Sequence, residues 1–241
     1  MQDRALYNDR AELYDAIYHW KDYPEECEAL STLLADEGVP DGARLLEAAC
    51  GTGKHLALLA ERYDVAGFDL AEGMLTHARQ RLPNAHLFQA DMSDFQVDRP
   101  YDALISLFSS IGYLQTAEAL ASAARCFAAA LRPGGVLIVE PWLNPAIFIP
   151  GHMSVQTYSS PDLKCTRACI GQLEGDVSVL NFHWLVLRQG AADVEYFTEQ
   201  HRLRLTPPDA LLAIFDDAGF EVRHDRDGLM RDRGLLIGRK R

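Results

Sequence analysis

The stretch Glu47-Ala-Ala-Cys-Gly51-Thr-Gly53-Lys-His55 decides the fold of this chain. It closes an apolar run over residues 44–50, which predicts a strand that enters a Gly-x-Gly turn. Because glycine has no Cβ, such a turn lets the backbone pass close to a ligand. A dinucleotide-binding turn would carry a small residue where Leu56 stands. The pattern favours a nucleoside ligand without phosphates near the turn, although an ordinary tight turn remains an alternative.

Strand and helix patterns alternate on both sides of this turn. Apolar runs predict strands, and intervening 3.6-residue periods predict helices over residues 55–62, 73–81 and 116–131. The alternation predicts an α/β fold with a parallel, doubly wound sheet. A helix over residues 207–218 precedes two last strands, so we expect seven strands in this Rossmann-like sheet. They are predicted at residues 44–50, 65–69, 85–89, 101–108, 136–140, 220–224 and 234–238.

The pattern changes between the fifth and sixth of these strands. Four β-rich runs, separated by short Asp/Gly turns, predict an antiparallel meander at residues 154–158, 165–173, 177–187 and 195–205. Residues 10–35 predict two helices that are broken near Pro24. We therefore expect an N-terminal helical cap over residues 1–40, a ligand-binding α/β domain over 41–150 and 206–241, and an antiparallel β insert over 151–205. The insert is expected to act as a lid or a dimerisation surface.

Charge and composition narrow the choice of partners. The 241 residues carry a formal net charge of -12, which disfavours nucleic acid and anionic membranes as partners. No apolar run approaches the roughly 18 residues of a membrane span, and residues 1–20 lack a signal-like apolar core. The five scattered cysteines fit a reducing compartment, so we expect a cytoplasmic protein. The spacing of the eight histidines suggests no metal site.

Side chains at the ends of the second and third predicted strands suit an adenosine ligand. Asp69 can accept hydrogen bonds from both ribose hydroxyls, or it can cap the following helix. Asp91 can accept a hydrogen bond from the adenine amino group. Met92 and Met74 can pack on the two faces of the ring, with core packing as the alternative for each.

The segment Phe108-Ser-Ser-Ile-Gly-Tyr113 follows the fourth strand, at the sheet edge where ligands bind in this class of fold. Its two serines can equally cap a helix. His183 and His201 fall on strands of the insert, where we expect structural or surface roles. His55 begins a helix beside the Gly-x-Gly turn and is expected to hydrogen-bond locally.

Taken in order, four motifs resemble the signature of class I S-adenosylmethionine (SAM)-dependent methyltransferases. They are Glu47-x-x-Cys-Gly-Thr-Gly53, the strand-end Asp69, Ala90-Asp-Met92 and Leu131-Arg-Pro-Gly-Gly135. Three longer stretches are similar to the TDP-aminosugar N,N-dimethyltransferases of the desosamine and mycaminose type, and the similarity runs from about Ala11 to Gly238. These stretches are Asp69–Pro83, Phe108–Leu114 and Val139–Trp142.

The resemblance implies SAM as cofactor, a homodimer, and a small-molecule substrate that binds between the sheet edge and the insert. It places Tyr14 over the active site and Tyr113 near the reacting amine, as the catalytic residues. Substrate contacts are expected from Ser110, Trp142 and Arg233, of which Arg233 would face the nucleotide. Cofactor contacts are expected from Ala48, Cys50, Gly51, Gly53, Asp69, Leu70, Met74, Asp91, Met92 and Phe108.

The expected reaction is transfer of a methyl group from the SAM sulfonium to an amine. Alignment of the two reactants can contribute roughly 7–11 kcal/mol. An alkyl amine with a pKa of about 8–10 must first lose a proton, which costs about 1.4 kcal/mol per pH unit. We therefore expect no essential general base. Tyr113 would orient the amine, and Tyr14 would offer its ring face or hydroxyl to the sulfonium, unless it is a core aromatic.

The amino-acid sequence also allows other functions. The same cofactor site can serve O- or carboxyl-methylation of another small molecule, or a SAM-binding protein without activity. An NAD-dependent oxidoreductase is disfavoured by Leu56 and by the lack of a Tyr-x-x-x-Lys motif. A DNA base methyltransferase would need an Asn/Asp-Pro-Pro-aromatic tetrad after the fourth strand, where Phe108-Ser-Ser-Ile stands.

Overall fold

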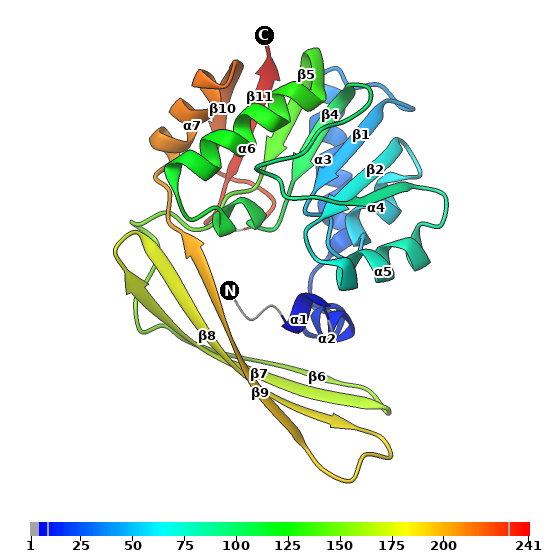
Figure 1. Ribbon diagram of the computed structural model, residues 1–241, viewed down its shortest axis with the longest axis vertical. Helices are drawn as coiled ribbons and strands as arrows, with labels where there is room; N and C mark the ends of the chain where they lie inside the picture. The colour runs from blue at the N-terminus through cyan, green and yellow to red at the C-terminus, as the bar shows by residue number, and fades with distance from the viewer. Residues whose placement is uncertain (1–4, 9, 231) are drawn as a thin grey trace.

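The computed structural model describes residues 5–8, 10–230 and 232–241, and within them the chain forms two sheets (Figure 1). The larger sheet has the order β10-β11-β5-β4-β1-β2-β3. Strands β1 to β5 run parallel, and β11 runs antiparallel to its neighbours β5 and β10. The strands are β1 (Arg44–Ala48), β2 (Asp64–Asp69), β3 (His86–Gln89), β4 (Tyr101–Ser106), β5 (Leu131–Val139), β10 (Phe220–Asp225) and β11 (Leu235–Lys240).

Helices cover both faces of this sheet, which confirms the doubly wound prediction. Leu45 of β1 packs with α3 (Tyr23–Asp36), α4 (Lys54–Leu59) and α5 (Glu72–Arg81) on one face. The next residue, Leu46, packs on the opposite face with α6 (Ala117–Ala130) and α7 (Pro208–Asp217). Adjacent strand residues point to opposite faces, so a strand that is apolar throughout is buried on both.

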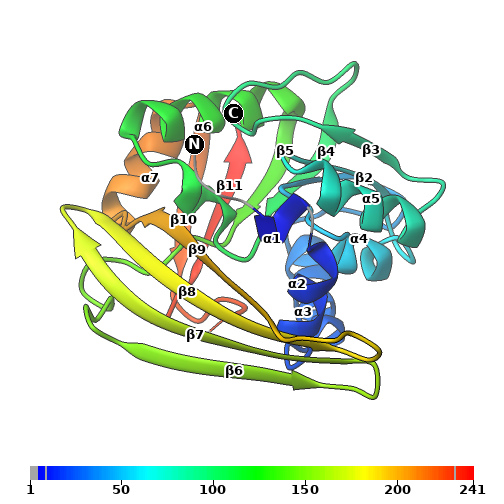
Figure 2. The ribbon, with the colours of Figure 1, turned by 60° about the horizontal axis from the view of Figure 1, so that its bottom comes forward.

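The predicted meander forms the smaller sheet, in which consecutive strands pair antiparallel. Its inner face packs on α1 (Ala5–Asn8) and α2 (Ala11–Ile17), through a core centred on the fully buried Trp184. Figure 2 shows α1 and α2 lying between this sheet and the larger one. The four strands, which we call the insert sheet, are β6 (Met153–Ser159), β7 (Leu163–Glu174), β8 (Val177–Arg188) and β9 (Glu195–Arg204).

Three details differ from the sequence expectation. The fifth strand, predicted over residues 136–140, already begins at Leu131, because β5 pairs with β4 from that residue and the register then shifts before Val136. Helix α1 was not predicted, since four residues are too few to show a helical period. The antiparallel direction of β11 was also not predicted, because local pattern does not give the order or direction of strand pairing.

The strand order reverses between β1 and β4, where the connections from these two strands leave in opposite directions across the sheet. Open α/β sheets bind ligands in the crevice at the carboxyl ends of such strands. Among the described residues, no helix is long and apolar enough to cross a membrane.

Candidate active site

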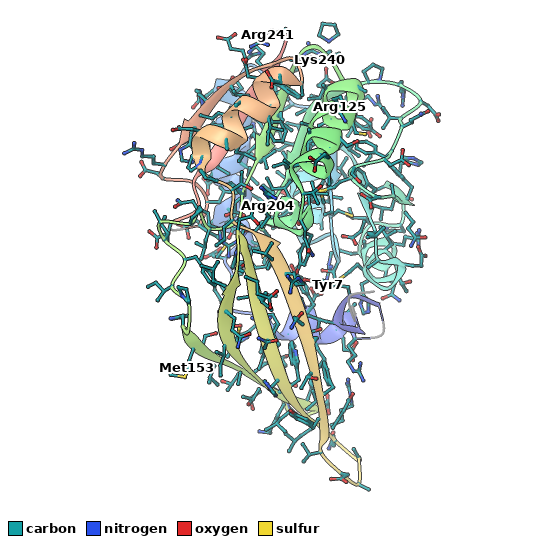
Figure 3. All side chains as sticks on the ribbon, turned by 60° about the vertical axis from the view of Figure 1, so that its left-hand side comes forward. Tyr7, Arg125, Met153, Arg204, Lys240 and Arg241 are labelled. Carbon is teal, nitrogen blue, oxygen red and sulfur yellow. The ribbon has the colours of Figure 1, made fainter. Side chains whose placement is uncertain are left out.

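A cavity of about 660 Å³ lies at this edge of the larger sheet. Its lining comes from the loops after β1, β2, β3, β4 and β5, from α1 and α2, and from the inner face of the insert sheet. Tyr7 of α1, which is labelled in Figure 3, lies where these parts meet. Segments that are far apart in the sequence therefore enclose one site.

The cofactor end of the cavity is organised by Asp69. One carboxylate oxygen accepts a hydrogen bond from the Gly51 backbone nitrogen at 2.9 Å, and the other accepts from Ala71 nitrogen at 2.8 Å. Gly51 has a φ of 54°, and a side chain in its place would meet no atom within 4 Å. The turn thus presents an open backbone surface beside a carboxylate, which fits the ribose and methionine parts of SAM.

Seven of the ten predicted cofactor residues line the cavity: Gly51, Asp69, Leu70, Met74, Asp91, Met92 and Phe108. The other three belong to the end of β1 and to the turn that follows it. Ala48 and Cys50 bury their side chains in the two cores of the sheet, and Gly53 precedes the first residue of α4. Ala49, which was not predicted, lines the cavity in their place. The direction of each side chain along the turn decides which residues face the cavity. The spacing of residues in the sequence does not give that direction.

Asp91 and the two methionines, which are predicted to contact the adenine, all line the cavity. The exposed Asp91 accepts hydrogen bonds from the backbone nitrogen and the hydroxyl of Ser93, at 2.8 and 2.7 Å. Met92 is half-buried. Met74 is 2 % exposed and packs against Tyr7 and Tyr14, so it is both a core residue and part of the cavity wall.

The segment after β4 bends sharply at Phe108 and Ser109, which both line the cavity. Phe108 and Ser109 adopt φ values of 52° and 66°, which are unusual for residues other than glycine. The Phe108 nitrogen donates to the buried carboxylate of Glu140 at 2.7 Å, and this bond holds the bend. Burial raises the pKa of Glu140, although nearby Arg233 opposes the shift. Strain held by a buried acid beside a cavity is a common property of functional sites.

The three predicted substrate residues, Ser110, Trp142 and Arg233, all line the cavity. Arg233 donates to the Ser109 hydroxyl at 2.8 Å, and its guanidinium lies 5.1 Å from the ring centre of Trp142. The Trp142 indole nitrogen in turn donates to the Ser178 hydroxyl at 2.9 Å, which ties this corner to the insert sheet. The guanidinium is thus positioned by side chains from both parts of the molecule.

Both predicted catalytic tyrosines line the same cavity. The Tyr14 ring centre lies 4.8 Å from that of Tyr18 and 6.4 Å from that of Phe108. Burial raises the pKa of Tyr14 well above its usual value, with a further contribution from neighbouring Tyr23. The hydroxyl therefore stays protonated and neutral, so Tyr14 can contribute only its ring face or its hydroxyl dipole.

Tyr113 lies in a short 3₁₀ helix, η1 (Ser110–Tyr113), that packs closely against β9. Gly112 permits the approach, because a Cβ there would lie 3.0 Å from Trp142 Cβ and 3.1 Å from a Leu203 methyl. The Tyr113 hydroxyl lies 2.6 Å from the Tyr7 hydroxyl and 2.6 Å from His201 Nδ1.

Tyr7 and His201 are two further cavity residues that sequence reasoning missed. Both line the cavity. The burial of alternate residues in β9 places His201 on the inner face, but the sequence did not show what that face covers. Tyr7 precedes the first helical pattern and carried no signal at all.

A buried ionic cluster lies behind the cofactor turn. His55 Nε2 lies 3.0 Å from Glu26 Oε2, and His55 Nδ1 lies 3.5 Å from Glu47 Oε1. Lys21 pairs with Glu26 and lies 4.7 Å from the ring centre of Phe108. Burial alone would lower the pKa of His55, but its two carboxylate partners outweigh this and raise it. The expectation of a local bond for His55 was wrong, because its partners come from α3 and β1.

Residues 45–135 match the family model described as "Methyltransferase domain". A Streptomyces venezuelae relative, "dTDP-3-amino-3,4,6-trideoxy-alpha-D-glucopyranose N,N-dimethyltransferase", is 38% identical over 95% of this chain and 97% of its own length. A Streptomyces fradiae relative, "dTDP-3-amino-3,6-dideoxy-alpha-D-glucopyranose N,N-dimethyltransferase", is 36% identical over 95% of this chain and 89% of its own.

Solved structures agree with these relatives. S. venezuelae DesVI superposes with a TM-score of 0.89 at 36% identity, over 96% of this chain and 98% of that one. SAM-bound CalS10, an amino pentose methyltransferase from Micromonospora echinaspora, gives 0.85 at 32% identity, over 95% and 97%. The fold and site therefore define a SAM-dependent methyltransferase. Within that class, the chain belongs to the family of the dTDP-aminosugar N,N-dimethyltransferases.

Proposed function

We propose that this methyltransferase transfers methyl groups to the amino group of a nucleotide-linked amino sugar. The observation that carries the proposal is the single cavity that extends from Asp69 to Arg233, with Tyr14 and Tyr113 both in its lining. Its volume of about 660 Å³ lies within the usual range for small-molecule sites of about 300–1,000 Å³. The printed activities of the relatives support the same substrate class.

Each part of the lining has a role in this proposal. Asp69 and Asp91 hold the adenosine, and SAM supplies a methyl group on a positively charged sulfur. Tyr14 and Tyr113 orient the acceptor nitrogen toward that methyl group, which is the main requirement of an in-line transfer. The guanidinium of Arg233 binds the diphosphate, because its planar set of donors matches phosphate oxygens.

The proposal is tested with purified protein, SAM and dTDP-3-amino-3,4,6-trideoxy-α-D-glucopyranose, the substrate named for one relative. We expect S-adenosylhomocysteine to form together with a sugar that has gained two methyl groups on nitrogen, as detected by mass spectrometry. dTDP-glucose, which lacks the amine, is the control and should stay unchanged. Tight SAM binding without turnover would favour the non-catalytic alternative. Methylation of phenols or carboxylates in a parallel panel would favour the other methyltransferases.

We further propose that the insert acts as a lid and as the interface of a homodimer. Its outer face carries exposed apolar side chains, and no charged residue interrupts three successive cross-strand rows. A surface of exposed apolar side chains among uncharged polar ones fits an interface, and a two-fold dimer can bury the same patch on both copies. The rows are Met153-Ile170-Asn181-Gln200, Val155-Ala168-His183-Thr198 and Thr157-Thr166-Leu185-Tyr196.

Molar mass in solution tests the homodimer. The parent protein should elute from size exclusion with light scattering as a dimer, and Val155→Asp combined with Leu185→Lys should give the monomer. Thr32→Asp, an exposed change on α3, is the control and should leave the mass unchanged. A parent protein that is monomeric at micromolar concentration would contradict the proposal.

The cellular setting follows from the same substrate class. We propose a cytoplasmic enzyme of secondary metabolism, since amino sugars of this kind decorate antibiotics. All five cysteines are unpaired, which supports a reducing compartment. We also propose that the chain divides into a cap over residues 1–40, a SAM-binding α/β domain over 41–150 and 206–241, and an insert over 151–205.

A further inference from the structure

A chain of hydrogen-bonding groups leads away from the acceptor end of the cavity into the insert sheet. The Tyr113 hydroxyl lies 2.6 Å from His201 Nδ1, and the Tyr7 hydroxyl lies 3.3 Å from the same nitrogen. On the opposite side of the imidazole, His201 Nε2 lies 3.4 Å from Glu199 Oε1. The chain therefore runs from a phenol in the cavity wall, through an imidazole, to a carboxylate.

The far end of this chain is buried. His201 is 6 % exposed and Glu199 is 4 % exposed. One Glu199 oxygen accepts from the Trp184 indole at 3.0 Å, and the other has no hydrogen-bond partner among the described residues. A buried carboxylate is costly unless a positive charge lies close to it. Arg167 supplies one such charge near Glu199, and a proton that arrives on the imidazole would add a second, 3.4 Å from Glu199 Oε1.

Among the polar side chains at this end of the cavity, His201 is the one best suited to accept a proton. Tyr7 from α1 and Tyr113 from η1 face its Nδ1, and the Phe182 ring of β8 packs edge-on at 4.9 Å. Arg167 of β7 also lines the cavity, but its guanidinium donates to Tyr18 and Gln156. Burial raises the pKa of Tyr7 well above its usual value, so that phenol remains a hydrogen-bond donor.

The reaction of the proposed function requires a proton acceptor. An alkyl amine is mostly ammonium near neutral pH and has no lone pair to attack a methyl group. Each transfer to a neutral amine also produces an N-methylated ammonium, which must lose a proton before a second transfer. The acceptor nitrogen therefore has to lose a proton in each round, and a proton acceptor in the site lets this happen on the bound substrate.

We propose that His201, acting through Tyr113 and backed by Glu199, takes this proton. The N–H bond of the ammonium breaks, and nitrogen keeps the electron pair. The proton passes to the Tyr113 oxygen while the original Tyr113 proton moves to His201 Nδ1. The resulting imidazolium faces Glu199. The freed nitrogen pair then forms the N–CH₃ bond as the C–S bond breaks toward sulfur. This inference rests on the proposed function and adds a proton path to it.

The test is the pH dependence of kcat/KM for His201→Gln and Glu199→Gln, with SAM and dTDP-3-amino-3,4,6-trideoxy-α-D-glucopyranose. At about pH 6.5 we expect His201→Gln to lose about tenfold to a hundredfold, which is at or below the lower end of the usual range of about 10²–10⁴ for acid–base catalysis, because solvent offers a slower path. The loss should shrink toward parent activity as the pH approaches the pKa of the substrate amine. Glu199→Gln should lose less of kcat/KM than His201→Gln, with the same dependence of the loss on pH.

Product distribution gives a second readout. His201→Gln should release monomethylated sugar, because the second round also needs a deprotonated nitrogen. Tyr113→Phe, which removes a single oxygen, should show the same pH dependence of kcat/KM as His201→Gln. This variant tests the proposal even if the histidine variant does not fold. His86→Gln, an exposed change on β3, is the matched control and should behave as the parent.

A loss that is equal at every pH would overturn the proposal, since a merely structural role predicts that result. Unchanged activity of His201→Gln and Tyr113→Phe would overturn it as well. Failure of the proposed function itself looks different, because the parent protein would then leave the amino sugar unmethylated at all pH values.

Discussion

Asp69 accepts a hydrogen bond from the backbone nitrogen of Gly51 at 2.9 Å, which joins the ends of two neighbouring strands, β2 and β1. The same carboxylate accepts from Ala71 at the start of α5. Asp69 is therefore a structural link between the turn and the helix, and it also borders the cavity where the ribose is expected. Both roles depend on one charge.

Asp69→Ala is expected to weaken SAM binding by at least tenfold, because charge-assisted hydrogen bonds to the ribose contribute about 1.5–3 kcal/mol. Gly51→Val should weaken it as well, since valine is strained at a φ of 54° and would project into the open turn. Calorimetric titration with SAM measures both. Asp64→Ala, at the exposed opposite end of the same strand, is the control. Parent-like affinity in both cofactor-site variants would place the SAM site elsewhere.

Tyr113→Phe is expected to lower kcat/KM by less than about a hundredfold near neutral pH, because alignment and the sulfonium leaving group remain in place. Steady-state rates with a dTDP-amino sugar measure the effect. Tyr101→Phe, at the opposite end of the strand that precedes Tyr113, should leave the rate unchanged. Complete inactivity of a folded Tyr113→Phe protein would mean that an essential base had been removed.

Arg233→Ala is expected to raise the KM for the nucleotide sugar by more than about tenfold, because a charged hydrogen bond contributes about 1.5–3 kcal/mol. The affinity for SAM should change little, since Arg233 contacts Ser109, Trp142 and the Phe108 ring but neither Gly51 nor Asp69 in any contact described above. Initial rates and SAM titration separate the two effects. Arg226→Ala, an exposed arginine in the same region of the chain, is the control. A shift confined to SAM affinity would contradict the proposed role.

Glu140→Gln is expected to stabilise the protein at pH 7 by about 1 kcal/mol, or about 2–4 °C in Tm. Burial raises the folded-state pKa of Glu140 above its unfolded value of 4.5. Its stabilising contribution is therefore complete below pH 4.5 and is lost as the pH rises through the folded-state pKa. Glutamine carries no charge to bury and can still accept from the Phe108 nitrogen.

Thermal melts of the parent and Glu140→Gln proteins across this pH range provide the measurement. The Tm difference should be close to zero at pH 4.5 and grow toward pH 7. Glu28→Gln, an exposed change on α3, should give no such trend. A parent protein that is more stable than the variant at pH 7 would mean that the ionised carboxylate is stabilising.

Some members of the site were predictable because they follow local rules. Asp69 ends one strand with a strong apolar pattern and Phe108 lies just beyond another, and parallel strands bring their carboxyl ends to one edge of the sheet. Gly51 was identifiable because only glycine combines a tight turn with open backbone. For these residues, position along a strand already implies position in space.

Other members depend on packing between distant segments. Tyr7 and Tyr113 are separated by 106 positions, and Tyr113 and His201 by 88, yet their polar atoms lie within hydrogen-bonding distance. No periodic pattern links them, because the insert sheet and α1 are brought to the cavity by the core around Trp184. The choice between Ala48 and Ala49 was also not predictable. The direction of the chain in the turn buries Ala48 and places Ala49 in the cavity wall.

The amino-acid sequence alone determined the doubly wound sheet, the antiparallel insert and the SAM-binding turn, since each depends on hydrophobic period or on glycine at fixed spacing. The tertiary structure alone decided the place of β11 between β5 and β10, the seating of the insert over the sheet edge, and the Tyr113–His201–Glu199 arrangement. These features arise because apolar faces bury each other. The hydrophobic effect has no preferred direction, so local sequence does not specify which faces meet.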